Sequence, residues 1–254
     1  MHQSRLGRQE FGQNFLVDTR VIDHIVGLVA ERPGPIVEWG TGNGALTLGL
    51  DRLGRRLGGI EIDPRRVQEL KRKVGPHVCI SEGDILRHAP PAGAVLVSNI
   101  PFHLTTPILR HLLRSRRWTD AVLVTQWEVA RKRAGVGGAT QLTAQWWPWY
   151  EFALDQRIPS TAFRPRPSID AGLLLIHRRS EPLLPEQKQR SYQAWVARVF
   201  SSRGRGIVEI LRRNGVPRRI AADLVRRERN RPVALARDLL AEDWATAYRS
   251  AQGS

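Results

Sequence analysis

The chain has 254 residues, 41% of them hydrophobic, which supports one large folded domain together with a smaller one. Its formal net charge is +16, from 40 Lys and Arg against 24 Asp and Glu, so we expect a polyanionic partner, most simply a nucleic acid. The single cysteine, Cys79, excludes an intramolecular disulfide, and no Cys/His spacing typical of a metal site is present.

The N-terminal residues 1–15 are expected to form a basic arm that ends at Gln13 and Asn14, and they lack the apolar stretch of a secretion signal. No apolar run elsewhere approaches the length of a membrane-spanning helix. We therefore expect a cytoplasmic protein without membrane contact. Apolar residues then recur at helical spacing from Val17 to Ala30, which predicts the first helix.

A glycine-rich turn follows a short apolar strand that begins at Pro35. Residues 38–44 have the form E-x-G-x-G-x-G and lead into an apolar helix at Ala45. Glycine allows positive φ and close approach of the backbone to a ligand, and the spacing is neither the G-x-G-x-x-G dinucleotide fingerprint nor a phosphate-binding loop. Glu38 ends the strand, where it could anchor the turn or a ligand amino group. Taken alone, the segment also fits an ordinary strand-to-helix turn.

Two further strands end on acidic residues. Glu61 lies roughly twenty residues beyond the glycine turn, where a doubly wound sheet places a carboxylate for ribose hydroxyls. Asp63 and Pro64 are predicted to cap a helix over residues 65–74, and Asp84 follows the next strand, where it could accept a hydrogen bond from an adenine amine. Each acidic strand end alone is weak evidence. Three in order after a glycine turn indicate a crevice for S-adenosylmethionine at the carboxyl ends of parallel strands.

The fourth strand, residues 95–98, runs into Asn99-Ile100-Pro101-Phe102, which has the form N-[I/P]-P-[F/Y]. The lone pair of an adenine amino nitrogen is delocalised into the ring, so that nitrogen is a poor nucleophile. An Asn side-chain carbonyl and the carbonyl of Ile100 can accept both of its N–H bonds and draw it toward tetrahedral geometry. Pro101 stiffens the turn, and Phe102 offers a face on which an extruded base can stack. This tetrapeptide predicts an adenine-N6 methyl-transfer site.

The next part of the chain continues to alternate strands and helices. We predict a buried strand over 121–126, a short helix over 128–134, a glycine loop at 135–138, and a late strand pair over 146–158 and 171–177. The tryptophans of the first late strand are expected to be core residues. Arg164 and Arg166 flank prolines in a stiff loop, where they fit phosphate contacts and a solvated loop equally well.

A boundary is expected at residues 181–185, after which the pattern turns helical over 187–200, 206–213, 217–227 and 233–248. The sequence thus predicts an α/β protein. Residues 16–180 form a Rossmann-like, S-adenosylmethionine-dependent methyltransferase sheet with helices on both faces, and residues 181–254 form a small all-α domain. This domain is dense in arginine with few carboxylates to balance it, which favours an RNA-binding face over solvated helix surfaces.

Over roughly residues 8–180 the chain resembles the Erm rRNA adenine-N6 methyltransferases, which confer resistance to macrolide, lincosamide and streptogramin B antibiotics. The resemblance rests on the Gln13-Asn14-Phe15-Leu16 element, the glycine turn, Glu61, Asp84, Asn99–Phe102, residues 125–133 and residues 163–171. One departure is Trp39, where smaller aliphatic residues are usual. The order of the late strands in a seven-stranded sheet also comes from this resemblance.

The resemblance implies roles for individual residues. Asn99, Ile100, Pro101 and Phe102 would hold the target base, and Phe163 would close the base pocket from the other side. RNA-binding residues would be Phe163, Arg164, Arg166, Arg131 and Arg133. Cofactor-binding residues would be Gln13, Asn14, Leu16, Glu38, Gly40, Gly42, Glu61, Ile62, Asp84, Ile85 and Asn99, with no metal involved.

The implied reaction is mono- or dimethylation of an adenine of 23S rRNA beside the macrolide site in the peptide exit tunnel. The implied substrate is naked or immature rRNA, and we expect a monomer. The alternatives are a small-subunit rRNA dimethyladenosine transferase, an RNA-binding assembly factor with a vestigial transferase site, and a DNA adenine methyltransferase. The last would normally need a larger sequence-reading domain than residues 182–254.

Overall fold

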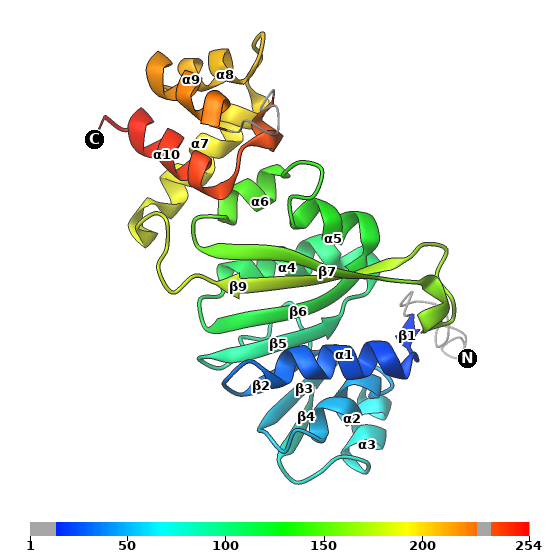
Figure 1. The fold of residues 1–254 in the computed structure, drawn as a ribbon. Coiled ribbons are helices and arrows are strands. Elements are labelled where there is room, and N and C mark those ends of the chain that lie inside the picture. The colour runs from blue at the N-terminus through cyan, green and yellow to red at the C-terminus, as the bar shows by residue number, and fades with distance from the viewer. Residues whose placement is uncertain (1–13, 228–234, 254) are drawn as a thin grey trace, which may run out of the picture. The chain divides into compact units, whose positions relative to one another are not determined.

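The computed structural model describes residues 14–227 and 235–253 (Figure 1). These residues divide into two compact units. The first comprises residues 1–130 and 154–176, and the second comprises residues 131–153 and 177–254. The α/β class and the small helical part predicted from the sequence are both confirmed.

One large sheet, seven-stranded in the part of the chain that is described, has the order β4-β3-β2-β5-β6-β9-β7. Its strands are β2 (Ile36–Trp39), β3 (Leu57–Glu61), β4 (Val78–Glu82), β5 (Ala94–Asn99), β6 (Trp118–Gln126), β7 (Tyr150–Ile158) and β9 (Ala171–Arg178). Strands β4, β3, β2, β5 and β6 run parallel to one another. Because parallel strands are covered on both faces, they need nearly continuous apolar runs, which β5 supplies with Val95, Leu96 and Val97. The carboxyl ends of β2, β3 and β5 therefore meet at one edge.

The helices of the first unit lie on both faces of the sheet. They are α1 (Thr19–Ala30), α2 (Ala45–Asp51), α3 (Pro64–Lys71), α4 (Thr105–Arg114) and most of α5 (Trp127–Arg133). The buried side of α1 packs in one core cluster with Ile36, Val95 and Val97. The opposite face carries Trp39, whose ring contacts His111 of α4. Both faces are thus covered at the centre of the sheet.

Helix caps decide where these helices begin. The Asp18 carboxylate accepts the backbone N–H groups of Arg20 and Val21, so α1 begins at Thr19 and not at Val17. Asp63 accepts the N–H of Arg65 and Pro64 occupies the first turn of α3, which confirms the predicted cap. A separate antiparallel pair joins β1 (Phe15–Leu16) to β8 (Phe163–Arg164). Short 3₁₀ turns span η1 (Phe102–Leu104) and η2 (Ser160–Ala162).

The second unit is built from α6 (Gln141–Trp146), α7 (Gln189–Ser201), α8 (Ile207–Arg213), α9 (Arg218–Arg227) and α10 (Ala241–Ala251), with turns η3 (Glu186–Lys188) and η4 (Ala236–Asp238). Its core is aromatic: Tyr192 contacts Trp149 and Tyr248, and Trp195 contacts Trp244, all edge-on. Edge-to-face packing suits the quadrupoles of aromatic rings. Trp147 and Trp149 are buried, as predicted.

Two element predictions in this unit were wrong in their bounds. Residues 146–149 are not strand, because Thr140 caps α6 by accepting the N–H of Thr143 and the chain extends into β7 only at Tyr150. The last helix begins at Ala241 and not at residue 233. The Asp243 carboxylate accepts the N–H of Leu240 and starts the helix there. Residues 233 and 234 lie outside the described residues. No described helix combines the length and the hydropathy needed to cross a bilayer.

Candidate functional site

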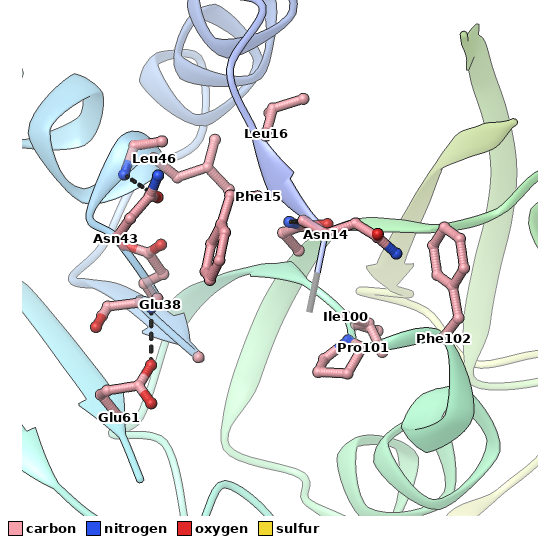
Figure 2. Close-up of a pocket in the computed structure, with 15 residues that line it drawn as sticks. Asn14, Phe15, Leu16, Glu38, Asn43, Leu46, Glu61, Ile100, Pro101 and Phe102 are labelled. Carbon is pink, nitrogen blue, oxygen red and sulfur yellow. Dashed lines mark hydrogen bonds between the residues drawn. The ribbon is translucent and has the colours of Figure 1, made fainter. Parts of the chain in front are cut away.

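A cavity of about 580 Å³, counting the part open to solvent, lies at the carboxyl edge of the first unit's sheet (Figure 2). The ends of β2, β3 and β5 supply Glu38, Glu61 and Asn99, and β1 supplies one further wall. Fifteen residues line it: Asn14, Phe15, Leu16, Glu38, Gly40, Thr41, Gly42, Asn43, Ala45, Leu46, Glu61, Asn99, Ile100, Pro101 and Phe102. The structure therefore brings the glycine turn and the N-I-P-F segment to a single cavity.

The glycine turn needs glycine at its first two glycine positions. Gly40 has φ +75° and Gly42 has φ +55°, in the left-handed region that side chains rarely adopt. A Cβ on Gly42 would also lie 3.1 Å from the Phe15 ring, whereas a Cβ on Gly40 would meet nothing within 4 Å. The N–H of Gly40 is bonded to the Ile60 carbonyl at 2.8 Å, which ties the turn to β3.

Glu61 is held by the backbone. Its Oε2 accepts the N–H of Gly42 at 2.7 Å, and its Oε1 accepts the N–H groups of Ile62 and Asp63 at 3.0 Å each. The side chain is only 2% exposed. A carboxylate can accept about four hydrogen bonds, so these three fix its orientation at the end of β3 and shape the glycine turn. Any ribose contact would use the capacity that is left.

Glu38 is a buried carboxyl beside the same cavity. Its Oε2 accepts the hydroxyl of Thr47 at 2.6 Å. Burial raises the pKa of Glu38 to about 8, and the nearby Glu61 charge adds to the rise, while the Thr47 hydrogen bond opposes it. Thr41, also lining the cavity, has a buried hydroxyl without a hydrogen-bond partner among the described residues. A ligand in this cavity with polar atoms of its own could pair with both groups.

Asn99 is oriented by the residue that precedes strand β1. Its Nδ2 donates to the backbone carbonyl of Asn14 at 2.9 Å, which fixes the donor end of the amide. No described residue donates to its Oδ1, so this acceptor remains for a ligand. The N–H of Ile100 is bonded to the Val124 carbonyl at 3.0 Å, which anchors the turn to β6. Phe102 is half-buried against the core and lines the cavity with Pro101 (Figure 2).

Several expected site residues lie elsewhere. Ile62, Asp84 and Ile85 follow β3 and β4 at the same edge of the sheet but do not line this cavity. The Asp84 carboxylate accepts the N–H of Leu86 at 2.9 Å. Gln13 falls outside the described residues.

Phe163 differs from what the resemblance implied. Its ring is fully buried in the core cluster, and its backbone pairs with Leu16. It is therefore absent from the cavity lining, because β8 turns this side chain inward while the neighbouring Arg164 is exposed. A base can reach the Phe163 ring only if this pairing shifts.

The expected RNA-binding arginines have different surroundings. Arg164 and Arg166 are exposed, and each donates to the loop around them, Arg164 to the Thr161 and Phe163 carbonyls and Arg166 to the Ser160 hydroxyl. In the second unit, Arg133 is half-buried and donates to the hydroxyl of Thr140 at 2.6 Å, where it supports the cap of α6. Arg131 is half-buried close to Gly137.

Sequence reasoning did not single out Phe15, Thr41, Asn43, Ala45 and Leu46 as cavity residues. Phe15 belongs to the Gln-Asn-Phe element, which could have indicated it, and the Arg66 guanidinium lies 4.6 Å from its ring centroid. Such a cation–π contact fixes the ring against the glycine turn. The other four follow from the turn itself, because the residues between and after its glycines also face the cavity.

Comparisons with known proteins agree with this geometry. A family model described as ribosomal RNA adenine dimethylase matches residues 4–252. The mycinamicin-resistance protein MyrB of Micromonospora griseorubida is 48% identical over 96% of this chain and 78% of that protein. An rRNA adenine N-6-methyltransferase of Corynebacterium diphtheriae is 49% identical over 82% of this chain and 83% of that protein. The solved structure of the 23S rRNA methyltransferase ErmE has a TM-score of 0.82 and 31% identity, over 94% of this chain and all of that one.

Proposed function

The chain belongs to the ribosomal RNA adenine dimethylase family, and from this membership we propose that it methylates N6 of one adenine of 23S rRNA with S-adenosylmethionine as the methyl donor. The modified adenine lies beside the macrolide site in the peptide exit tunnel. Its methylation confers resistance to macrolide, lincosamide and streptogramin B antibiotics, since the added methyl group occupies the place where the drug docks.

The observation that carries this proposal is the shared cavity. The amide of Asn99, whose Oδ1 is left for a ligand, opens onto the same space as the glycine turn and Glu61. A base amine at Asn99 and a methyl donor along the turn can therefore approach each other within one cavity. Catalysis then depends on positioning and electrostatics.

The residues of the cavity fit the cofactor. The glycine turn leaves room for a methionine moiety, Thr41 offers an unpartnered buried hydroxyl, and Glu38 offers a buried carboxyl for an ammonium group. Glu61 stands at the end of β3 for the ribose, and Asp84 follows β4 for the adenine. When bound, S-adenosylmethionine supplies an electrophilic methyl group on a sulfonium.

The chain's own residues prepare the base. Asn99 Oδ1 and the Ile100 carbonyl accept the two N6 hydrogens and aim the nitrogen lone pair at the methyl group. Phe102 stacks on the extruded adenine. This stacking offsets about 1–3 kcal/mol of the free energy needed to unstack the base. After transfer, N6 carries a positive charge and loses a proton to water. A second round would start from an N6 that carries one hydrogen and one methyl group, so it would use one of the two acceptors and need clearance for the methyl group already present.

We further propose that the substrate is naked or immature 23S rRNA and that the enzyme acts as a monomer in the cytoplasm, where large-subunit RNA is assembled. Arginines outside the cavity hold the RNA backbone, a contribution that depends on salt and little on sequence. The exposure of Arg164 in β8 and of Arg166 just after it supports this role.

The decisive experiment offers labelled S-adenosylmethionine with either protein-free 23S rRNA or intact 30S particles, then maps the modified base by primer extension and mass. We expect one labelled adenine in 23S rRNA, and its mass separates mono- from dimethylation. Labelling of 30S particles alone would instead make the chain a small-subunit rRNA dimethyladenosine transferase. Cofactor binding without labelling of either RNA would refute the proposed substrate.

A further inference from the structure

Trp39, the last residue of β2, makes a side-chain hydrogen bond behind the cofactor cavity. The indole is fully buried, and its Nε1 donates to Nδ1 of His88 at 3.0 Å. The same indole lies 5.4 Å from the His111 ring of α4, centroid to centroid. Trp39 is the position at which the sequence was expected to depart from the resemblance, and this contact depends on it.

The protonation of His88 follows from its partners. An indole N–H can only donate, so Nδ1 of His88 must be an unprotonated acceptor and the ring proton sits on Nε2. His111 Nε2 donates to the backbone carbonyl of His88 at 2.9 Å. His88 is therefore held at both its ring and its backbone, by β2 on one side and by α4 on the other.

The hydrogen bond between Trp39 and His88 connects the glycine turn with the loop that carries Asp84. The Trp39 carbonyl accepts the hydroxyl of Ser98, the neighbour of Asn99, at 2.7 Å, and the glycine turn begins at the next residue, Gly40. His88 lies in the loop that carries Asp84, which joins β4 to β5. That loop is tied to the site at only one other point before His88 among the described residues, where the N–H of Gly83 is bonded to the Glu61 carbonyl at 2.9 Å. The indole–imidazole bond thus sets the spacing between the glycine turn and the Asp84 loop.

We propose that His88 is a positioning residue for the cofactor: through Trp39 it holds the glycine turn and the Asp84 loop at the separation that S-adenosylmethionine requires. This rests on the assignment of the cofactor to this crevice. His88 itself does not line the cavity. It acts on the cofactor only through the two segments that it connects.

Protonation of His88 would break the bond, and the surroundings of the ring oppose that protonation. Burial and the neighbouring His111 lower the pKa of His88 below its ordinary value. Protonation would turn Nδ1 from an acceptor into a donor that faces the indole N–H, and the hydrogen bond would break. A hollow on this face of the sheet is lined, among the described residues, by basic and neutral side chains and by no carboxylate. Nothing in this lining would offset the charge of an added proton. Its titratable or charged members besides His88 are Arg56, His77, Cys79 and Arg117.

The test measures the dissociation constant of S-adenosylmethionine by calorimetry for the full chain and its variants at about pH 8 and about pH 5.5. His88→Asn keeps an acceptor near the position of Nδ1 but cannot be protonated. His88→Leu removes the acceptor, and Trp39→Phe removes the donor. His77→Asn is the matched control, because His77 lines the same hollow but bonds Asp51 instead of Trp39. Thermal melts show that each variant is folded.

We expect the wild type and His77→Asn to bind more weakly at the lower pH, in proportion to the fraction of His88 that is protonated there and by at most about tenfold, as for the loss of one buried hydrogen bond. His88→Asn should bind like the wild type at high pH and lose this acid response. His88→Leu and Trp39→Phe should bind about tenfold more weakly at both pH values, and the double variant should be no weaker than either. If His88→Leu fails to fold, the cofactor affinities of Trp39→Phe and His88→Asn are compared with that of the wild type instead.

Wild-type affinity retained in a folded His88→Leu or Trp39→Phe variant would overturn the inference, as would an unchanged acid response in His88→Asn. These results differ from a failure of the proposed function, in which the wild type itself would not bind the cofactor at either pH.

Discussion

The amide of Asn99 is oriented by a backbone carbonyl 85 residues earlier in the chain, that of Asn14. The sequence predicted that Asn99 accepts the hydrogens of the base. It could not show what orients the Asn99 amide, because every residue has a backbone carbonyl and residue type does not indicate which carbonyl accepts the bond. The same limit applies to Glu61. Its carboxylate was expected to face ribose, and most of its accepting capacity is used by backbone N–H groups of its own turn.

Replacing Asn99 with Ala should lower kcat about 100-fold or more, as for removal of one preorganised polar group from a transition state. The dissociation constant of S-adenosylmethionine should change by less than about threefold, because the turn and Glu61 remain. Single-turnover methylation of 23S rRNA and calorimetry separate the two quantities. Asn43→Ala, on the cofactor side of the same cavity, is the matched control and should weaken cofactor binding with little effect on kcat. A collapse of cofactor binding in Asn99→Ala would show that the assigned role is wrong.

Glu38 makes the stability of the protein depend on pH. Its pKa is about 8 in the folded protein against an ordinary 4.5. The folded state keeps this proton while the unfolded chain releases it, so the stability that Glu38 contributes is present below about pH 4.5 and is lost as pH rises toward 8. Glu38→Gln removes the ionisable group and keeps an oxygen that can accept the Thr47 hydroxyl.

Between about pH 5 and about pH 8, the unfolding free energy of Glu38→Gln relative to the wild type should rise by about 2–4 kcal/mol, at about 1.4 kcal/mol for each pKa unit. Urea unfolding at the two pH values measures this difference. Groups other than Glu38 titrate in both proteins and cancel. A difference that does not change with pH would mean that Glu38 ionises normally.

At the scale of elements, the glycine turn is where sequence and structure agree most closely. Its E-x-G-x-G-x-G spacing predicted a ligand-binding turn, and Gly40 and Gly42 both have the positive φ that such a turn requires. A Cβ at Gly42 would meet the Phe15 ring first, and that ring comes from β1, a strand too short to be recognised from periodicity. Its partner β8 lies far along the chain, so local sequence patterns could not predict the pairing.

Gly42→Ala should therefore impair both stability and cofactor binding. Its φ of +55° costs about 1–2 kcal/mol for alanine, and the new Cβ presses on Phe15 at 3.1 Å. Gly54→Ala is the matched control, since φ is +64° there and a Cβ meets nothing within 4 Å. Thermal melts should show a loss of stability in both variants, larger in Gly42→Ala because of the Phe15 contact, whereas calorimetry should show weaker cofactor binding only in Gly42→Ala. Equal cofactor affinities would argue against a role of the turn in binding.

Other elements show how local patterns mislead. The tryptophan- and tyrosine-rich segment at residues 146–150 favours a strand by composition, yet the cap at Thr140 makes α6 helical as far as Trp146. The aromatic rings were correctly expected in the core, because burial follows from their apolar area whatever the backbone does. The interleaving of the two units could not be predicted. Residues 131–153 belong to the second unit with 177–254, far along the chain.

At the scale of the whole molecule, the net charge of +16 is the property that most directly governs RNA binding. In the second unit, Arg205, Arg212 and Arg218 line one hollow and are exposed. Arg226 in the same unit is exposed as well, but it is paired with Asp223 at 2.8 Å. The three arginines are therefore the better candidates for binding phosphates.

Replacing Arg205, Arg212 and Arg218 with Ala together should weaken binding of 23S rRNA fragments. The slope of log affinity against log salt concentration should fall by about 0.7–0.9 for each phosphate that the variant no longer binds. Filter binding over a range of salt concentrations measures the slope, and calorimetry with S-adenosylmethionine should show unchanged affinity for the cofactor. Arg226→Ala serves as the control with little effect. An unchanged salt slope in the triple variant would place the RNA on another surface.

The hydrogen bond from the Asn99 amide to the Asn14 carbonyl connects the wall of the cofactor cavity with the residue proposed to bind the adenine. Asn14 and Phe15 form one wall of the cofactor cavity, and the same Asn14 turns the amide that receives the base. The pairing of β1 with β8 already holds Asn14 in place, and a cofactor resting against this wall would add to that support. We therefore expect S-adenosylmethionine to tighten the binding of 23S rRNA, and 23S rRNA to tighten the binding of S-adenosylmethionine by the same factor.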